Sequence, residues 1–288
     1  YAISLSVIHI FFINCLLFDF FSLFAYNLFG DFMKNKFKIL FRIISVIIIL
    51  ICTILLIIWA IENYKNTHIQ TNLIQSISII SSESSNDSNI INDLDNISPD
   101  EISKINVDYD SLKSTNSDSV GWIKINNTNI NYPIVQSYDN IYYLNHNFEK
   151  NFNRAGWIFA DYRNSFDILN QNTIIYGHNR RNGIMFSELK KYYDKDLTQN
   201  KYIYFNTNSN YYIGEIFSVY KVAADEADIP INFDDNDSFQ NYLNTWLNKS
   251  KYNFNTSVDV NHNILTLCTC DNSSSYRIIL HAKLVQIN

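Results

Sequence analysis

The chain has 288 residues, enough for one domain of ordinary size with additional segments. Its net charge of −6 and its pI near 5.5 exclude the broadly basic surface typical of nucleic-acid-binding proteins. The four cysteines form no disulfide framework: Cys15 and Cys52 lie in apolar segments, and Cys268 and Cys270 are two residues apart. Strand residues at this spacing are about 6.6 Å apart, near the upper limit for a disulfide. No second cysteine pair or histidine cluster accompanies them, so we expect no metal site and no cofactor.

Residues 1–32 are apolar and aromatic, and the first methionine is Met33. The sequence that follows Met33 is basic and leads into a long apolar run, as membrane-targeting N-termini normally do. This pattern predicts that translation begins at Met33 and that residues 1–32 come from upstream sequence. The alternative is a first membrane segment that forms a hairpin with the second.

The run Ile43–Ile61 carries no charge, and its length of about 19 residues is sufficient to span a bilayer core. It is preceded by the basic residues Lys34, Lys36, Lys38 and Arg42. This excess of positive charge on the N-terminal side of the run predicts a cytoplasmic N-terminus and places the rest of the chain outside the cell. No small-residue cleavage site follows the run, which favours a single-pass anchor over a cleaved signal peptide. We therefore expect an anchor over 33–65, a polar linker over 66–99 and a folded domain over 100–288.

The folded domain shows many short apolar runs separated by turn residues. Apolar spacing predicts helices at 100–112, 184–193 and 238–249, the last capped by Asp237 or Ser238. Strands are predicted at 121–125, 130–135, 156–161, 173–176, 202–205, 211–222, 264–270 and 277–284. Pro133 places the second of these strands at an edge or a bulge. The pattern predicts a mainly β fold, a closed or nearly closed barrel of seven or eight strands.

The last two predicted strands form a hairpin that carries two thiols and an arginine. Alternation gives it one apolar face, made of Leu265, Leu267, Ile278, Leu280, Ala282 and Leu284. Cys268, Cys270 and Arg277 lie on the other face, and Cys270 and Arg277 emerge at the same end. A guanidinium favours the thiolate form of a neighbouring thiol and supplies donors for an oxyanion. The alternative is that Cys270 is a small buried apolar residue and Arg277 a solvated strand end.

A nucleophilic cysteine usually needs a basic or cationic neighbour, and the chain has six histidines. Four of them have unfavourable positions in the doubtful N-terminus, the linker, a polar turn and the middle of a strand: His9, His68, His262 and His281. His178 directly follows a predicted strand and a glycine, where a rigid scaffold presents a side chain. The residues alone favour His178 over His146 and leave a structural role for both as the alternative.

Several motifs in this order resemble the sortases. Thr266-Leu267-Cys268-Thr269-Cys270, followed by Arg277, resembles the TLxTC signature, and Tyr176-Gly177-His178 is similar to the tripeptide that sortases carry upstream. The resemblance covers roughly residues 100–287 and is greatest to class B. Its further blocks are Gly121-Trp122-Ile123, Asn131-Tyr132-Pro133, Asp139-Asn140 with Tyr143-Leu144, Ile158-Phe159 with Asp161-Tyr162, and the helix at 238–249. Two features depart from class B: position 268 is cysteine where serine is usual, and the connection from Cys270 to Arg277 is short.

The resemblance implies a membrane-anchored cysteine transpeptidase that acts outside the cell. Cys270 would be the nucleophile, and His178 would act as the general acid and base. Arg277 and the backbone N–H of Asp271 would bind the oxyanion. The substrate-binding residues that it implies are Asn140, Leu144, Tyr176, Cys268, Thr269 and Asp271. The implied partners are secreted proteins with a C-terminal sorting motif, an amine of a peptidoglycan precursor or pilin, and the membrane.

Two other functions remain open from the sequence. A membrane-anchored cysteine protease would use the same residues but would transfer the acyl group only to water. A non-catalytic cell-wall-binding module on a stalk would leave Cys270 unreactive, and the full set of cysteine, histidine and arginine counts against it.

Overall fold

The computed structural model describes residues 35–74, 77–81, 103–180, 182–270 and 275–287. The chain divides into two compact units, Tyr1–Ala60 and Ile61–Asn288. The expectations for residues 1–32, including a start at Met33, lie outside the described residues, as does Asp271.

The long helix α2 (Asn35–Ile74) contains the predicted membrane segment. Arg42–Ile74 is long and apolar enough to cross a membrane, with a mean hydropathy of 3.2 in its most apolar window. The helix continues past Ile61 into residues that the sequence assigns to the linker. Its last turns belong to the second unit, where the buried side chains of Asn66 and Asn153 exchange two amide hydrogen bonds of 3.1 and 3.0 Å. This part of the expected linker is therefore packed against the folded domain.

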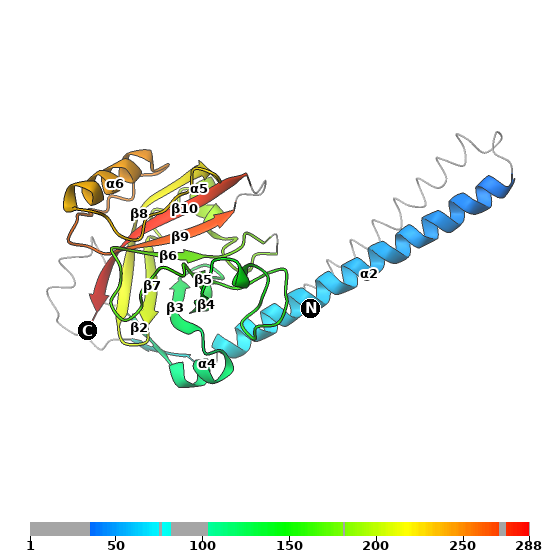
Figure 1. Ribbon diagram of the computed structural model, residues 1–288, viewed down its shortest axis with the longest axis horizontal. Helices are drawn as coiled ribbons and strands as arrows, with labels where there is room; N and C mark the ends of the chain where they lie inside the picture. The colour runs from blue at the N-terminus through cyan, green and yellow to red at the C-terminus, as the bar shows by residue number, and fades with distance from the viewer. Residues whose placement is uncertain (1–34, 75–76, 82–102, 181, 271–274, 288) are drawn as a thin grey trace. The chain divides into compact units, whose positions relative to one another are not determined.

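The second unit is a closed eight-stranded barrel, as the sequence predicts (Figure 1). Its strands run around the barrel in the order β10-β8-β7-β3-β4-β5-β6-β9. Their bounds are β3 (Ser119–Ile125), β4 (Asn131–Val135), β5 (Phe159–Ala160), β6 (Asn172–Tyr176), β7 (Tyr202–Thr207), β8 (Tyr211–Ala223), β9 (Ile264–Cys270) and β10 (Tyr276–Ile287). The short helices are α4 (Tyr109–Thr115), η2 (Tyr142–Leu144) and α5 (Leu189–Asp194), and the longer helix is α6 (Asn236–Lys249). Inward-facing residues such as Ile123, Leu267 and Leu280 fill the barrel.

The predicted helix at 100–112 is wrong over its middle, where β2 (Ser103–Val107) pairs antiparallel with β1 (Ile77–Ser81). Ile105 and Val107 are buried and the residues after each are exposed, which is strand alternation. Helical spacing was misleading because the partner strand β1 lies far upstream, and a ladder with it satisfies the backbone that a helix would otherwise satisfy. A helix does follow as α4, with Asp108 as its N-cap.

Other boundaries also shift. The predicted strand at 156–161 is reduced to the two residues of β5, and the helix at 184–193 begins only at Leu189. α6 is capped by Asp235 rather than by Asp237 or Ser238, because Asp235 accepts from the Ser238 backbone N–H in a capping box. β4 meets β5 only at Val135, so Pro133 lies on a locally unpaired edge, as its missing N–H predicts.

The outer face of β8, β9 and β10 is covered by α6 and the segment that precedes it (Figure 1). Trp246 of α6 stacks on Tyr220 of β8, with ring centroids 3.8 Å apart. Beneath them the Tyr220 hydroxyl donates to Nε2 of the buried His281, whose Nδ1–H donates to Thr266. The face opposite to the barrel interior is therefore buried over most of its length and opens only at the ends of the strands.

Candidate active site

Three adjacent strands bring Cys270, His178 and Arg277 to one edge of the barrel. β9 lies between β6, to which it is parallel, and β10, to which it is antiparallel. Arg277 is the direct partner of Cys270 across β9 and β10, which confirms that the two residues emerge at the same end of the hairpin. On the other side Tyr176 is the partner of Cys268, and continuing this register by two residues places His178 opposite Cys270.

Backbone and side-chain contacts hold the turn that carries His178. The Thr269 hydroxyl donates to the Gly177 carbonyl at 2.7 Å, and the Gly177 N–H donates to the Cys268 carbonyl at 3.2 Å. Only glycine fits at position 177, because a Cβ there would lie 2.5 Å from Ile158 and 2.8 Å from Phe186. The chain therefore stays in contact with β9 beyond the last paired residue of β6. These contacts hold the backbone that carries His178 in a fixed position.

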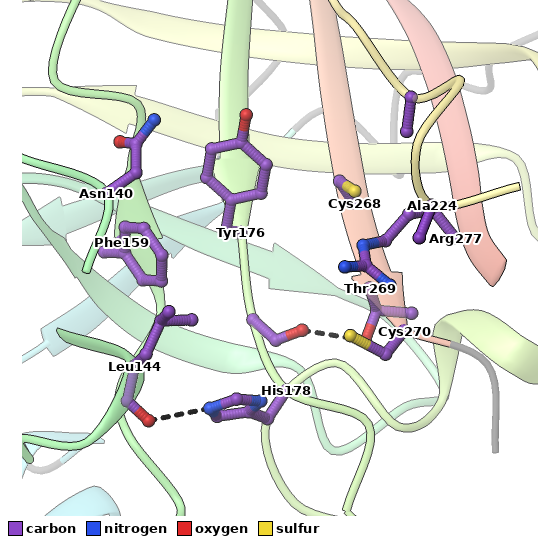
Figure 2. Close-up of a pocket in the computed structure, with 12 residues that line it drawn as sticks. Asn140, Leu144, Phe159, Tyr176, His178, Ala224, Cys268, Thr269, Cys270 and Arg277 are labelled. Carbon is purple, nitrogen blue, oxygen red and sulfur yellow. Dashed lines mark hydrogen bonds between the residues drawn. The ribbon is translucent and has the colours of Figure 1, made fainter. Parts of the chain in front are cut away.

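The orientation of the His178 ring follows from its partner. Nε2 lies 2.7 Å from the Leu144 carbonyl oxygen, which can only accept, so Nε2 carries a proton (Figure 2). Nδ1 is then the nitrogen that can take up or release a proton. In the view of Figure 2 the Cys270 sulfur lies between the His178 ring and the Arg277 guanidinium.

All three residues line one open pocket with a volume of about 320 Å³. Each described residue that the sequence assigns to the site lies in its wall. The full lining is Asn140, Leu144, Phe159, Tyr176, Gly177, His178, Ala224, Ala227, Cys268, Thr269, Cys270 and Arg277. The pocket joins parts of the chain that are up to 137 residues apart, from Asn140 to Arg277.

The two neighbouring cysteines have different surroundings. Cys268 is only 4% exposed and packs in an apolar cluster with Ile174 and Ile279. Burial raises the pKa of the Cys268 thiol to about 12, although the Arg277 charge opposes this, so the thiol stays protonated at neutral pH. Cys270 is partly exposed at the strand end, where a substrate can reach its sulfur.

His146, the competing histidine, lies outside this pocket lining. Its ring stacks on Tyr142 with centroids 4.1 Å apart, and Nδ1 donates to the Tyr142 carbonyl at 2.8 Å. These contacts account for His146 as a structural residue of the turn that follows η2.

The family model of the Sortase domain matches residues 123–285 of this sequence. The chain belongs to the sortase family. Sortase B of Listeria monocytogenes is 43% identical over 179 residues, which are 60% of this chain and 72% of that protein. A Bacillus anthracis protein described as similar to sortase B has a TM-score of 0.64 at 34% identity, covering 78% of this chain and 98% of that one. The Staphylococcus aureus sortase B–substrate complex has a TM-score of 0.60 at 35% identity, covering 62% and 85%. These relatives identify a class B sortase, a cysteine transpeptidase with a mainly β closed barrel.

Four residues of this sortase pocket were not predicted as site residues: Phe159, Gly177, Ala224 and Ala227. Phe159 and Gly177 lie within motifs that carry the family resemblance, so those motifs could have identified them. Ala224 and Ala227 follow β8 in an acidic, turn-rich segment and carry no chemical signal. They reach the pocket because Ala224 donates its N–H to the Ser275 carbonyl beside β10.

Burial lowers the pKa of His178 below its ordinary value of 6.5; the hydrogen bond to Leu144 opposes this shift and the Arg180 charge adds to it. We expect Arg180→Gln to raise the pKa of His178, because removing a nearby positive charge favours the imidazolium. A histidine NMR titration of the full chain in detergent measures this, with His178→Gln to assign the signal. Arg180→Lys, which keeps the charge, is the matched control. An unchanged pKa in Arg180→Gln would contradict this electrostatic account.

Proposed function

We propose that this sortase cleaves a C-terminal sorting signal after a threonine and transfers the new carboxyl group to an amine. The observation that carries the proposal is the placement of Cys270, His178 and Arg277 on three neighbouring strands around one pocket. The solved complex of S. aureus sortase B with a substrate supports a substrate-binding role for this fold.

In the first half-reaction the Cys270 thiolate attacks the threonine carbonyl carbon and a C–S bond forms. The negative charge moves to the carbonyl oxygen, where the planar donors of Arg277 and the backbone N–H of Asp271 stabilise it. Collapse of this intermediate breaks the C–N bond. The His178 imidazolium gives its Nδ1 proton to the leaving amine and becomes neutral.

In the second half-reaction an acceptor amine attacks the thioester. Neutral His178 takes a proton from the attacking nitrogen, the new C–N bond forms, and the Cys270 thiolate leaves. No net oxidation or reduction occurs, and the enzyme returns to its starting protonation state.

The apolar helix α2 supports a membrane-anchored enzyme. We infer a cytoplasmic N-terminus from the basic residues before the span, with the catalytic domain on the outer side. In this location the enzyme meets secreted precursors and a peptidoglycan-precursor or pilin amine.

Product analysis separates transpeptidation from the alternative of simple proteolysis. The full chain in detergent is mixed with a panel of threonine-containing sorting peptides, with and without triglycine as the amine. We expect an amide product that grows at the expense of the free acid as the amine concentration rises, and no product with Cys270→Ala. A free acid that the amine never diverts would identify a hydrolase, and absence of turnover with every peptide would favour a binding module.

A further inference from the structure

A fully buried carboxylate, Asp161, lies directly behind the wall of the pocket where β5 ends. It is not part of the pocket lining, and it accepts five hydrogen bonds. Two of them come from residues that do line the pocket: Asn140 Nδ2 at 3.0 Å and the Tyr176 hydroxyl at 3.0 Å, both to Oδ2. Asp161 therefore connects two side chains that come from different parts of the pocket wall.

The chemistry of these partners fixes both side chains. An ionised carboxylate only accepts, so the Asn140 amide must direct its NH₂ group toward Asp161. The Asn140 oxygen accepts from the Tyr162 backbone N–H at 3.0 Å, which only donates, so the amide cannot be reversed without losing both bonds. Tyr176 gives its single proton to Asp161. Its oxygen can therefore act toward a bound peptide only as an acceptor.

Arg163 connects the same carboxylate to another part of the wall. Its Nε and Nη2 donate to the two oxygens of Asp161 at 2.8 and 2.9 Å, a bidentate pair. Nη2 also donates to the Ile229 carbonyl at 3.1 Å. Ile229 lies two residues after Ala227, which lines the pocket, and packs in the same apolar cluster as Cys268.

The ionisation of Asp161 agrees with this arrangement. Burial by itself raises the pKa of the Asp161 carboxyl, but hydrogen bonds from Arg163 and Asn140, with the Arg163 charge, leave the pKa below its ordinary value. The group is thus a carboxylate at neutral pH and accepts from every partner.

We propose that Asp161 is a positioning residue for substrate binding, which holds Asn140 and Tyr176 in one orientation and, through Arg163, fixes the segment that carries Ala227. The inference rests on the proposed function, because it assigns these residues to the binding of the sorting peptide. Asp161 does not touch the reacting atoms and acts only through its neighbours. Its removal therefore affects peptide binding more than the chemistry of the Cys270 thiol.

The test is Asp161→Asn in the full chain in detergent. The new amide places an NH₂ group against donors and cannot complete the Arg163 fork, so KM for the sorting peptide should rise on the order of 10- to 100-fold. The fall in kcat should be smaller, and alkylation of Cys270 by iodoacetamide should keep its wild-type rate. Asp118→Asn is the matched control, because Asp118 also accepts from a tyrosine hydroxyl and pairs with a cation, but lies outside the pocket lining.

A mutant cycle separates positioning from a general structural role. In the Asn140→Ala/Tyr176→Phe background, Asp161→Asn should raise KM much less than in the wild type, because the two pocket residues that it holds are already removed and only the contact through Arg163 remains. Arg163→Lys provides a second route if Asp161→Asn does not fold. It keeps the charge but loses the fork, and it should also raise KM at unchanged alkylation rate.

The outcomes are distinct. If the wild type is active and KM is unchanged in both Asp161→Asn and Arg163→Lys, the positioning role is overturned and the proposed function is not. The positioning role is also overturned if Asp161→Asn raises KM as much in the Asn140→Ala/Tyr176→Phe background as in the wild type. A slower alkylation of Cys270 in Asp161→Asn that matches the loss of activity overturns it as well. The proposed function and this inference are overturned together if the wild-type enzyme turns over no sorting peptide and the Cys270→Ala variant binds none.

Discussion

Cys270→Ala should abolish turnover of the sorting peptide, with a loss on the order of 10⁴-fold or more, because no other group can form the thioacyl intermediate. Cys268→Ser should retain most of the activity, within about tenfold of the wild type. The physical difference lies in burial. Cys268 is enclosed among apolar side chains and keeps its proton, whereas Cys270 lies at the open strand end between His178 and Arg277. Steady-state kinetics of both variants in the full chain measure the contrast.

The intermediate itself provides a second measurement. Both cysteines fall on one tryptic fragment, between Lys251 and Arg277, so an added acyl mass on that fragment does not identify the thiol. The Cys268→Ser variant leaves Cys270 as the only thiol in the fragment. We expect acid-quenched Cys268→Ser enzyme to carry the acyl mass there. Complete loss of turnover in Cys268→Ser with activity retained in Cys270→Ala would reverse the assignment.

The hairpin of β9 and β10 could be predicted because its information is local. Alternation along each strand divides the residues between two faces, and a short connection brings the ends together. The observed register pairs Arg277 with Cys270 and Leu280 with Leu267, as the alternation requires. His178 could not be placed by periodicity, since its position opposite Cys270 depends on the parallel pairing of β6 with β9. The family motif provided that placement.

Other parts of the site depend on contacts that sequence spacing does not contain. Asp161, Asn140 and Tyr176 belong to three separate segments, and the pairing of β4 with β5 and of β5 with β6 brings them together. Alternation along β9 shows only that its outer face points away from the barrel core. The apolar residues of α6 and its preceding segment cover that face, and nothing in the strand itself predicts the cover.

Arg277→Lys should lower kcat/KM by about 10²- to 10³-fold, the usual cost of losing an oxyanion donor. The loss should be mainly in kcat, because the charge on the carbonyl oxygen develops only after Cys270 attacks. Lysine keeps the positive charge but presents a compact ammonium on a flexible stem, so it cannot reproduce the planar fork of donors. Arg154→Lys is the matched control, since Arg154 is outside the pocket lining and the substitution is the same.

Comparison of Arg277→Lys with Arg277→Gln separates geometry from charge. If the fork holds the oxyanion, both variants lose activity to a similar extent, because neither lysine nor glutamine offers parallel N–H donors on two different nitrogens, as a guanidinium does. If the positive charge alone is required, for example to favour the Cys270 thiolate, Arg277→Lys keeps most of the activity and Arg277→Gln does not. Thermal unfolding of the variants distinguishes both cases from damage to the β9–β10 ladder, which lowers Tm. Near-normal kinetics in both variants would assign Arg277 to the structure of the strand end and leave the oxyanion to backbone donors.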